Sequence, residues 1–175
     1  DDPTMLKMLS DMTGVNVRDI PIPDTKVMSL FQTTEALGIS EGASPAKSAT
    51  LGLPELGTFM ARDMIRETKP TRFYDLVQLM GLSHGTDVWK GNAQELIRNG
   101  TCTINEVIGC RDSIMTTLIH WNLPSKDAFD IMERVRKGRS LLPQQEDLMR
   151  QKQVPEWYID SCKKIKYMFP KAHAA

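Results

Sequence analysis

The sequence predicts an all-α fold, an irregular bundle of short helices joined by Pro and Gly breaks. Apolar residues recur at three- and four-residue spacing through most of the chain, which is typical of helices with one buried face. No segment alternates apolar and polar residues as a half-buried strand does, and no internal repeat is present. The 175 residues are enough to build a hydrophobic core.

Residues 1–37 are expected to form a first helix from Asp2 to Met12 and a second helical turn over Asp24–Phe31. Asp2 is a suitable N-cap, and Gly14 is a suitable end for the first helix. The apolar residues of that helix are Met5, Met8, Leu9 and Met12.

Residues 53–175 are expected to form the helical body, after a flexible loop over residues 38–52. The loop is predicted because Gly, Ser, Ala and Thr replace any apolar periodicity there. Pro54 opens the first helix of the body, and Thr71 caps the second. The predicted buried faces of these two helices are Leu56, Phe59, Met60, Met64 and Ile65, then Phe73, Leu76, Val77 and Met80.

Start and stop signals predict the remaining helices. A break over Gly81–Trp89 precedes a short helix that ends at Gly100, and Pro170 begins a last one. Between them, helices are expected over Arg111–Trp121, from Pro124 to Gly138, and from Pro155 to about Tyr167. Their predicted inward residues include Ile114, Met115, Leu118, Ile119, Phe129, Met132 and Val135.

Charge is distributed unevenly although Lys and Arg equal Asp and Glu in number. Residues 134–175 hold ten Lys or Arg and four Asp or Glu, whereas residues 1–133 are acidic overall. A basic C-terminal quarter favours a polyanionic partner, and a solvated basic face is the alternative. Tyr167 and Phe169 lie among the lysines and either stack on bases or belong to the core.

The sequence argues against several classes of protein and of functional site. Three Cys without a Cys-x-x-Cys pair indicate reduced thiols and a cytoplasmic location, and no apolar stretch reaches the roughly 20 residues that a membrane span needs. Ser83, His84 and Asp87 are too close in sequence to converge as a hydrolase triad. The acidic pairs Asp1 with Asp2 and Asp127 with Asp130 suit helix starts better than a metal site.

Four segments together resemble the bacterial C-family replicative DNA polymerases, specifically the PolC type of the DNA polymerase III alpha subunit. The segments are Lys26–Leu37, Gly81–Trp89, Val107–Asp112 and Val154–Ala175. The resemblance covers nearly the whole chain and implies part of the polymerase fingers. Residues 1–37 would then be the entry from the palm, residues 38–52 a flexible loop, and residues 53–175 the fingers body, truncated at its C-terminus.

The resemblance also implies where the catalytic metal would be held and which partners the chain would have. The three palm aspartates of the family precede this region, so the Mg²⁺ of the full enzyme would be held by palm residues absent from this chain. No catalytic residue or metal ligand is therefore expected here, and the isolated fragment should be inactive. The implied partners are dNTP, primer-template DNA and the remainder of the polymerase chain, and through it the sliding clamp and the replisome. No membrane partner is expected.

The matching motifs assign the candidate nucleotide-binding residues. Ser83 and His84 would border the nucleotide pocket, and His173 would lie near the phosphates. The candidates for triphosphate contacts are Arg111, Arg136, Lys137, Lys163, Lys164 and Lys171. The alternative, from another class, is a freestanding all-α module that binds nucleic acid or protein without catalysis. A reading frame that continues beyond Ala175 would favour the polymerase.

Overall fold

The computed structural model describes residues 2–40 and 49–175, and every regular element within them is helical. An isolated bridge between Thr86 and Tyr167 is the one β-type pairing in these ranges. The predicted all-α class is therefore confirmed. Among the described residues, no helix is both long enough and apolar enough to cross a membrane.

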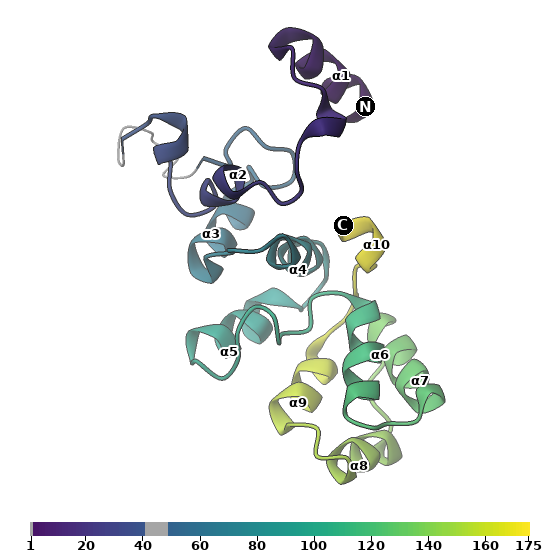
Figure 1. The fold of residues 1–175 in the computed structure, drawn as a ribbon. Helices are drawn as coiled ribbons and strands as arrows, with labels where there is room; N and C mark the ends of the chain where they lie inside the picture. The colour runs from purple at the N-terminus through teal and green to yellow at the C-terminus, as the bar shows by residue number, and fades with distance from the viewer. Residues whose placement is uncertain (1, 41–48) are drawn as a thin grey trace.

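The N-terminal arm, residues 2–40, consists of α1 (Asp2–Thr13), η1 (Val17–Asp19), α2 (Thr25–Ser29) and η2 (Glu35–Leu37). Figure 1 shows α1 projecting away from the other helices. Its apolar side chains are consequently exposed: Met5, Met8, Leu9 and Met12. Of the expected loop over residues 38–52, residues 41–48 lie outside the described part of the chain. At its far end the Thr50 hydroxyl donates to the Leu56 carbonyl at 3.1 Å.

Two helices follow, α3 (Phe59–Thr68) and α4 (Phe73–His84), and both differ from the prediction. Helix α3 begins after Thr58, whose hydroxyl accepts from the Ala61 amide, so Pro54 does not open it. Phe59 is 75% exposed, and its predicted place on the buried face is wrong. Met64 and Ile65 are buried as predicted.

Helix α4 continues through Gly81, where a break was predicted. A Cβ at this position would lie 2.4 Å from the Gly109 carbonyl oxygen and 2.6 Å from the Cys110 sulfur. Glycine is therefore used for close packing against another segment, not to end the helix. As a consequence, Ser83 and His84 belong to the last turn of α4 instead of a loop.

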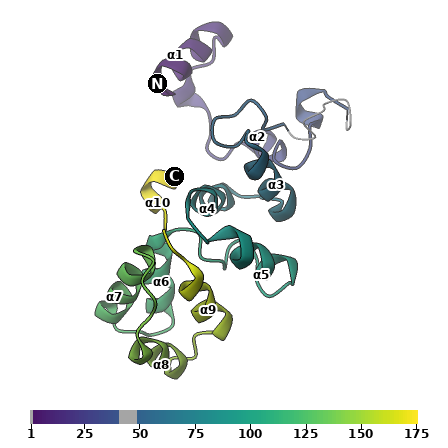
Figure 2. The same cartoon turned by 180° about the vertical axis from the view of Figure 1, so that it is seen from behind.

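The C-terminal half holds η3 (Trp89–Ala93), α5 (Gln94–Arg98), α6 (Arg111–His120), α7 (Ser125–Arg136), α8 (Pro143–Gln151), α9 (Glu156–Lys164) and α10 (Lys171–Ala174). Helices α6 to α9 group together, and α10 lies beside α4 in both views (Figures 1 and 2). Helix α9 ends at Lys164, before the predicted end near Tyr167. Phe129 and Ile119, which were predicted to face inward, are exposed.

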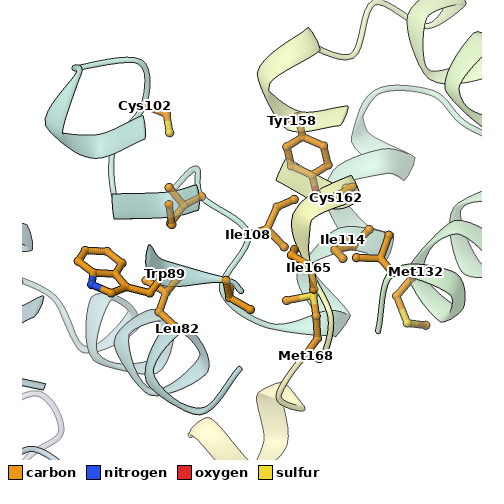
Figure 3. Close-up of a cluster of buried hydrophobic side chains, with 14 of the residues drawn as sticks. Leu82, Trp89, Cys102, Ile108, Ile114, Met132, Tyr158, Cys162, Ile165 and Met168 are labelled. Atoms are coloured by element: carbon orange, nitrogen blue, oxygen red, sulfur yellow. The ribbon is translucent and has the colours of Figure 1, made fainter. Parts of the chain in front are cut away.

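Helices α6, α7 and α9 contribute to a core that also takes buried residues from α2, α3, α4, η3, α8 and the loops between helices. Ile114, Ile131 and Ile159 have no exposed surface, and Figure 3 shows Ile114, Met132 and Cys162 meeting in one cluster. The three cysteines Cys102, Cys110 and Cys162 are free thiols, and all are buried. Burial raises the pKa of Cys102 and of Cys110 to about 11 and raises that of Cys162 further.

Candidate functional site

Ser83 and His84 are fixed at the C-terminal end of α4. The Ser83 hydroxyl donates to the Met80 carbonyl at 3.0 Å, and His84 Nδ1 lies 2.8 Å from the same oxygen. Because a carbonyl oxygen only accepts, this geometry places a hydrogen on Nδ1. The imidazole ring stacks on Phe169, with 4.7 Å between the ring centroids.

Phe169 reaches His84 because the segment after α9 pairs with the end of α4. The Thr86 amide donates to the Tyr167 carbonyl at 3.0 Å, and the Lys166 amide donates to the Thr86 carbonyl at 3.0 Å. The Arg111 amide in turn donates to the Phe169 carbonyl at 3.2 Å. This segment therefore joins α4 to the first residue of α6.

Helix α10 adds the last members of the site. The Lys171 amide donates to Asp112 Oδ2 at 2.8 Å, which tethers the start of α10 to α6. The Lys171 ammonium lies 5.1 Å from the centre of the Tyr74 ring, a cation–π contact. His173 meets Phe169 edge to face, at 5.9 Å between ring centroids.

Five of the nine predicted residues thus converge where α4, α6 and α10 meet. We call this the α10 surface and define it by Ser83, His84, Arg111, Phe169, Lys171 and His173. Two carboxylates border it: Asp112 Oδ2 is 3.8 Å from Arg111 Nε, and Glu55 Oε2 is 3.2 Å from His84 Nε2. Lys171 is exposed, and Arg111 is half-buried. The surface therefore carries accessible positive charge with planar side chains beside it.

The other four predicted cations have different partners. Arg136 Nε and Lys137 Nζ lie 2.7 and 3.0 Å from the Glu133 carboxylate. Hydrogen bonds from these two cations lower the pKa of the Glu133 carboxyl to about 2.

Lys163 and Lys164 end α9 and contact other elements. Lys163 Nζ is 3.3 Å from Glu146 on α8, and Lys164 Nζ donates to the Gly91 carbonyl at 2.8 Å. These two lysines are therefore held at α8 and η3, and the structure does not bring them to the α10 surface.

Three contributors to the α10 surface were not among the predicted site residues. In the sequence, Phe169 is a candidate for base stacking, and Asp112 beside Arg111 at a helix start suggests an ion pair or a helix cap first and a site residue only if it faces the basic cluster. Tyr74 carries no signal that distinguishes it from an ordinary helix residue. The contacts of Tyr74 and Asp112 join α4 or α6 to α10, far away along the chain. Only the fold brings these residues together.

A metal centre does not fit the described side chains. Within residues 2–40 and 49–175, no group of three or more His, Cys, Asp or Glu could hold a metal ion. We therefore assign no step to a metal held by this part of the chain.

Comparison with known proteins identifies the family. The bacterial DNA polymerase III alpha subunit finger domain matches residues 2–154. The chain is 58% identical to a DNA polymerase III PolC-type from Bacillus subtilis and 58% identical to one from Bacillus cereus, each over all 175 residues. A Staphylococcus aureus relative of the same name is 54% identical over the same length. The chain spans 12% of the length of each relative. It belongs to the family of bacterial DNA polymerase III alpha subunit finger domains, of the PolC type.

Proposed function

We propose that this chain is the fingers portion of a DNA-directed DNA polymerase and that its α10 surface holds the triphosphate of an incoming dNTP. The convergence of Arg111, Lys171 and His173 around the stacked pair His84 and Phe169 carries the proposal. Family membership supports the polymerase assignment, because the relatives are DNA polymerases by name. The freestanding binding module has no observation of its own in its favour.

The cations of the α10 surface suit phosphates in two ways. Arg111 can hold two phosphate oxygens with its planar guanidinium, whereas Lys171 acts as a point charge. In nucleotidyl transfer the primer 3′-hydroxyl attacks the α-phosphorus, and negative charge develops on the leaving pyrophosphate. Cations already in position stabilise that charge most strongly in the transition state.

His84 and Phe169 provide the planar part of the site. Their stacked rings suit contact with the base of the nucleotide or with the nascent base pair, because every base has an aromatic face. The Glu55 carboxylate lies beside His84 Nε2 and would repel a triphosphate there. Nucleotide binding would therefore have to move this exposed carboxylate aside. The candidates Arg136, Lys137, Lys163 and Lys164 are left out of the proposed triphosphate site because carboxylates or a carbonyl already hold them.

The rest of the polymerase would supply what this chain lacks. Divalent ions, Mg²⁺ in the proposal, would be held by carboxylates of a palm outside the chain and would activate the attacking hydroxyl. Residues 1–37 would lead from that palm into the fingers, and residues 53–175 would form the fingers body. Primer-template DNA and the remaining polymerase chain are the proposed partners, with the sliding clamp and the replisome reached through that chain.

Primer extension by the polymerase that carries this chain tests the proposal. We expect Lys171→Ala and Arg111→Ala each to raise the dNTP KM about 10-fold, since a hydrogen bond to a charged group contributes about 1.5–3 kcal/mol. Lys163→Ala removes the same charge as Lys171→Ala but from a lysine held by Glu146. The KM of this control should stay within about 2-fold of the wild-type value. Equal effects of Lys163→Ala and Lys171→Ala would refute the α10 surface as the triphosphate site.

A further inference from the structure

A second charged surface lies at the end of α7, where the turn that follows α7 packs on the segment that follows α9. Gly138 has a φ of +65°, and a Cβ there would lie 2.4 Å from the Lys166 carbonyl oxygen. Only glycine combines this backbone conformation with this approach. We call the result the Gly138 surface and define it by Arg136, Lys137, Arg139, Lys166 and Tyr167.

The Gly138 surface has an excess of positive charge. Arg136 and Lys137 share the Glu133 carboxylate. The side chains of Arg139 and Lys166 are exposed, and neither side chain makes a hydrogen bond or ion pair with any residue that the structure describes. Two of these four cations are therefore paired with one carboxylate, and the other two are available to a ligand.

A hollow of about 310 Å³ adjoins these cations. Its polar lining includes two acidic residues, Asp130 and Glu133, and the cations Arg134, Lys137 and Arg139. The Arg134 guanidinium already donates to the Ser140 carbonyl at 2.8 Å, and Lys137 Nζ lies 3.0 Å from the Glu133 carboxylate. Of the three cations that line the hollow, Arg139 is therefore the one left to face a bound anion.

Tyr167 supplies an exposed ring beside the cations. It is 46% exposed, although its neighbours Ile165 and Met168 are almost fully buried. Its backbone is fixed by the pairing with Thr86, so the ring is presented from a rigid segment. An exposed aromatic ring flanked by cations is the combination with which proteins hold single-stranded nucleic acid.

We propose that the Gly138 surface binds single-stranded DNA, with phosphates on Arg139 and Lys166 and an unpaired base stacked on Tyr167. A single strand is favoured over a duplex because the bases of a duplex already stack on one another and offer no free face. Tyr167 and Phe169 belong to the same segment, so a strand bound here would run beside the α10 surface. That last placement rests on the proposed function, whereas the binding itself does not.

Fluorescence anisotropy of a short labelled oligothymidine with the 175-residue chain tests the stacking. We expect Tyr167→Ala to weaken binding about 10-fold, in line with the loss of one base stack, and Tyr167→Phe to bind as the wild type does. Circular dichroism of each variant checks that the helices are retained. Unchanged binding by a folded Tyr167→Ala chain would overturn the stacking role.

The salt dependence of the same titration tests the phosphate contacts. Removing both free cations in Arg139→Ala/Lys166→Ala should lower the slope of log Kd against log salt by about 1.4, because each cation displaces counterions from a single strand. Lys90→Ala/Lys126→Ala removes the same charge from two other exposed lysines and should leave the slope unchanged. Equal slopes for the two double variants, or equal affinity for duplex and single strand, would refute the surface as a single-strand site.

The two proposals fail in different ways. If Lys171→Ala raises the dNTP KM while Tyr167→Ala binds oligothymidine normally, the proposed function stands and the single-strand site is refuted. If Tyr167→Ala weakens oligothymidine binding while Lys171→Ala leaves the dNTP KM unchanged, the single-strand site stands and the triphosphate site is refuted.

Discussion

The α10 surface carries the same kinds of cation as the α7–α9 region, by which we mean Arg136, Lys137, Lys163 and Lys164, but the two hold their cations differently. At the α10 surface, Lys171 lies over the Tyr74 ring, and the nearest carboxylate to Arg111 is 3.8 Å away. In the α7–α9 region, Arg136 and Lys163 each lie within 3.3 Å of a glutamate oxygen. The density of cations along a sequence therefore does not measure the positive potential that a ligand meets. What decides is whether a carboxylate lies within reach of each cation.

This difference is partly visible in the sequence. Glu133 precedes Arg136 by three residues and Lys137 by four, and both spacings bring side chains together on a helix. The partner of Lys163 is not visible, because Glu146 lies on another helix. Local pairing can therefore be read before the fold is known, whereas tertiary pairing cannot.

The largest expected effect is on the free energy of unfolding, and it comes from the close contact between Gly138 and the Lys166 backbone. Gly138→Ala would force a side chain into the Lys166 backbone and should lower the free energy of unfolding by about 2–3 kcal/mol. Gly100→Ala is the matched control, because Gly100 has a similar φ of +68° but nothing within 4 Å of its added Cβ. This control should cost only about 1 kcal/mol. Urea denaturation measures both values, and equal losses would contradict the tight contact at Lys166.

A smaller effect is expected when cations that are paired with a carboxylate are freed from it. Glu133→Gln releases Arg136 and Lys137 from their shared carboxylate, so the Gly138 surface should resemble the α10 surface in accessible charge. We expect oligothymidine to bind about 3-fold more tightly, with a salt slope steeper by about 0.7 for each cation that gains a phosphate. Glu95→Gln makes the same change of charge on α5 and should not alter the slope. A slope unchanged by Glu133→Gln would show that the two cations do not reach the strand.

The smallest effect is a pH dependence of stability. The pKa of Glu133 is lowered in the folded chain from its usual 4.5 to about 2, so its ionised form stabilises the fold. That contribution is fully present above about pH 4.5 and is lost as the pH falls towards 2. The stability difference between the wild type and Glu133→Gln should therefore shrink on acidification. Urea unfolding of both proteins at neutral pH and near pH 3 measures this, and a difference that grows would contradict the sign.

Helix ends with clear chemical signals could be predicted from the sequence. Pro124 and Pro155 precede α7 and α9 as expected, and Gly100 has the positive φ that ends a helix. Helix α8 was missed although Pro143 occupies its first turn, because its polar sequence shows no apolar stripe around Met149. The continuation of α4 through Gly81 was missed for another reason, since it depends on packing against Gly109.

Some residues of the candidate site could be predicted from the sequence, but their arrangement in space could not. Resemblance to the family pointed to Ser83, His84 and Lys171, which the fold brings to one surface. The same reasoning could not separate these from Lys163 and Lys164, which are equally basic and nearer in sequence to Lys171 than His84 is. The Thr86–Tyr167 bridge brings the segment after α9 to the end of α4, so Lys171 reaches the site whereas Lys163 and Lys164 do not. This bridge is a tertiary feature and cannot be read from the sequence.

The burial of all three cysteines makes the chain convenient for site-directed labelling. Cys102, Cys110 and Cys162 are shielded from solvent, and burial keeps their thiols protonated and thus unreactive at neutral pH. A cysteine introduced at the exposed Ala172 of α10 would therefore react with a maleimide dye far faster than the native thiols. Such a reporter would sit beside Lys171 and could follow the movement of α10 without removal of any native cysteine.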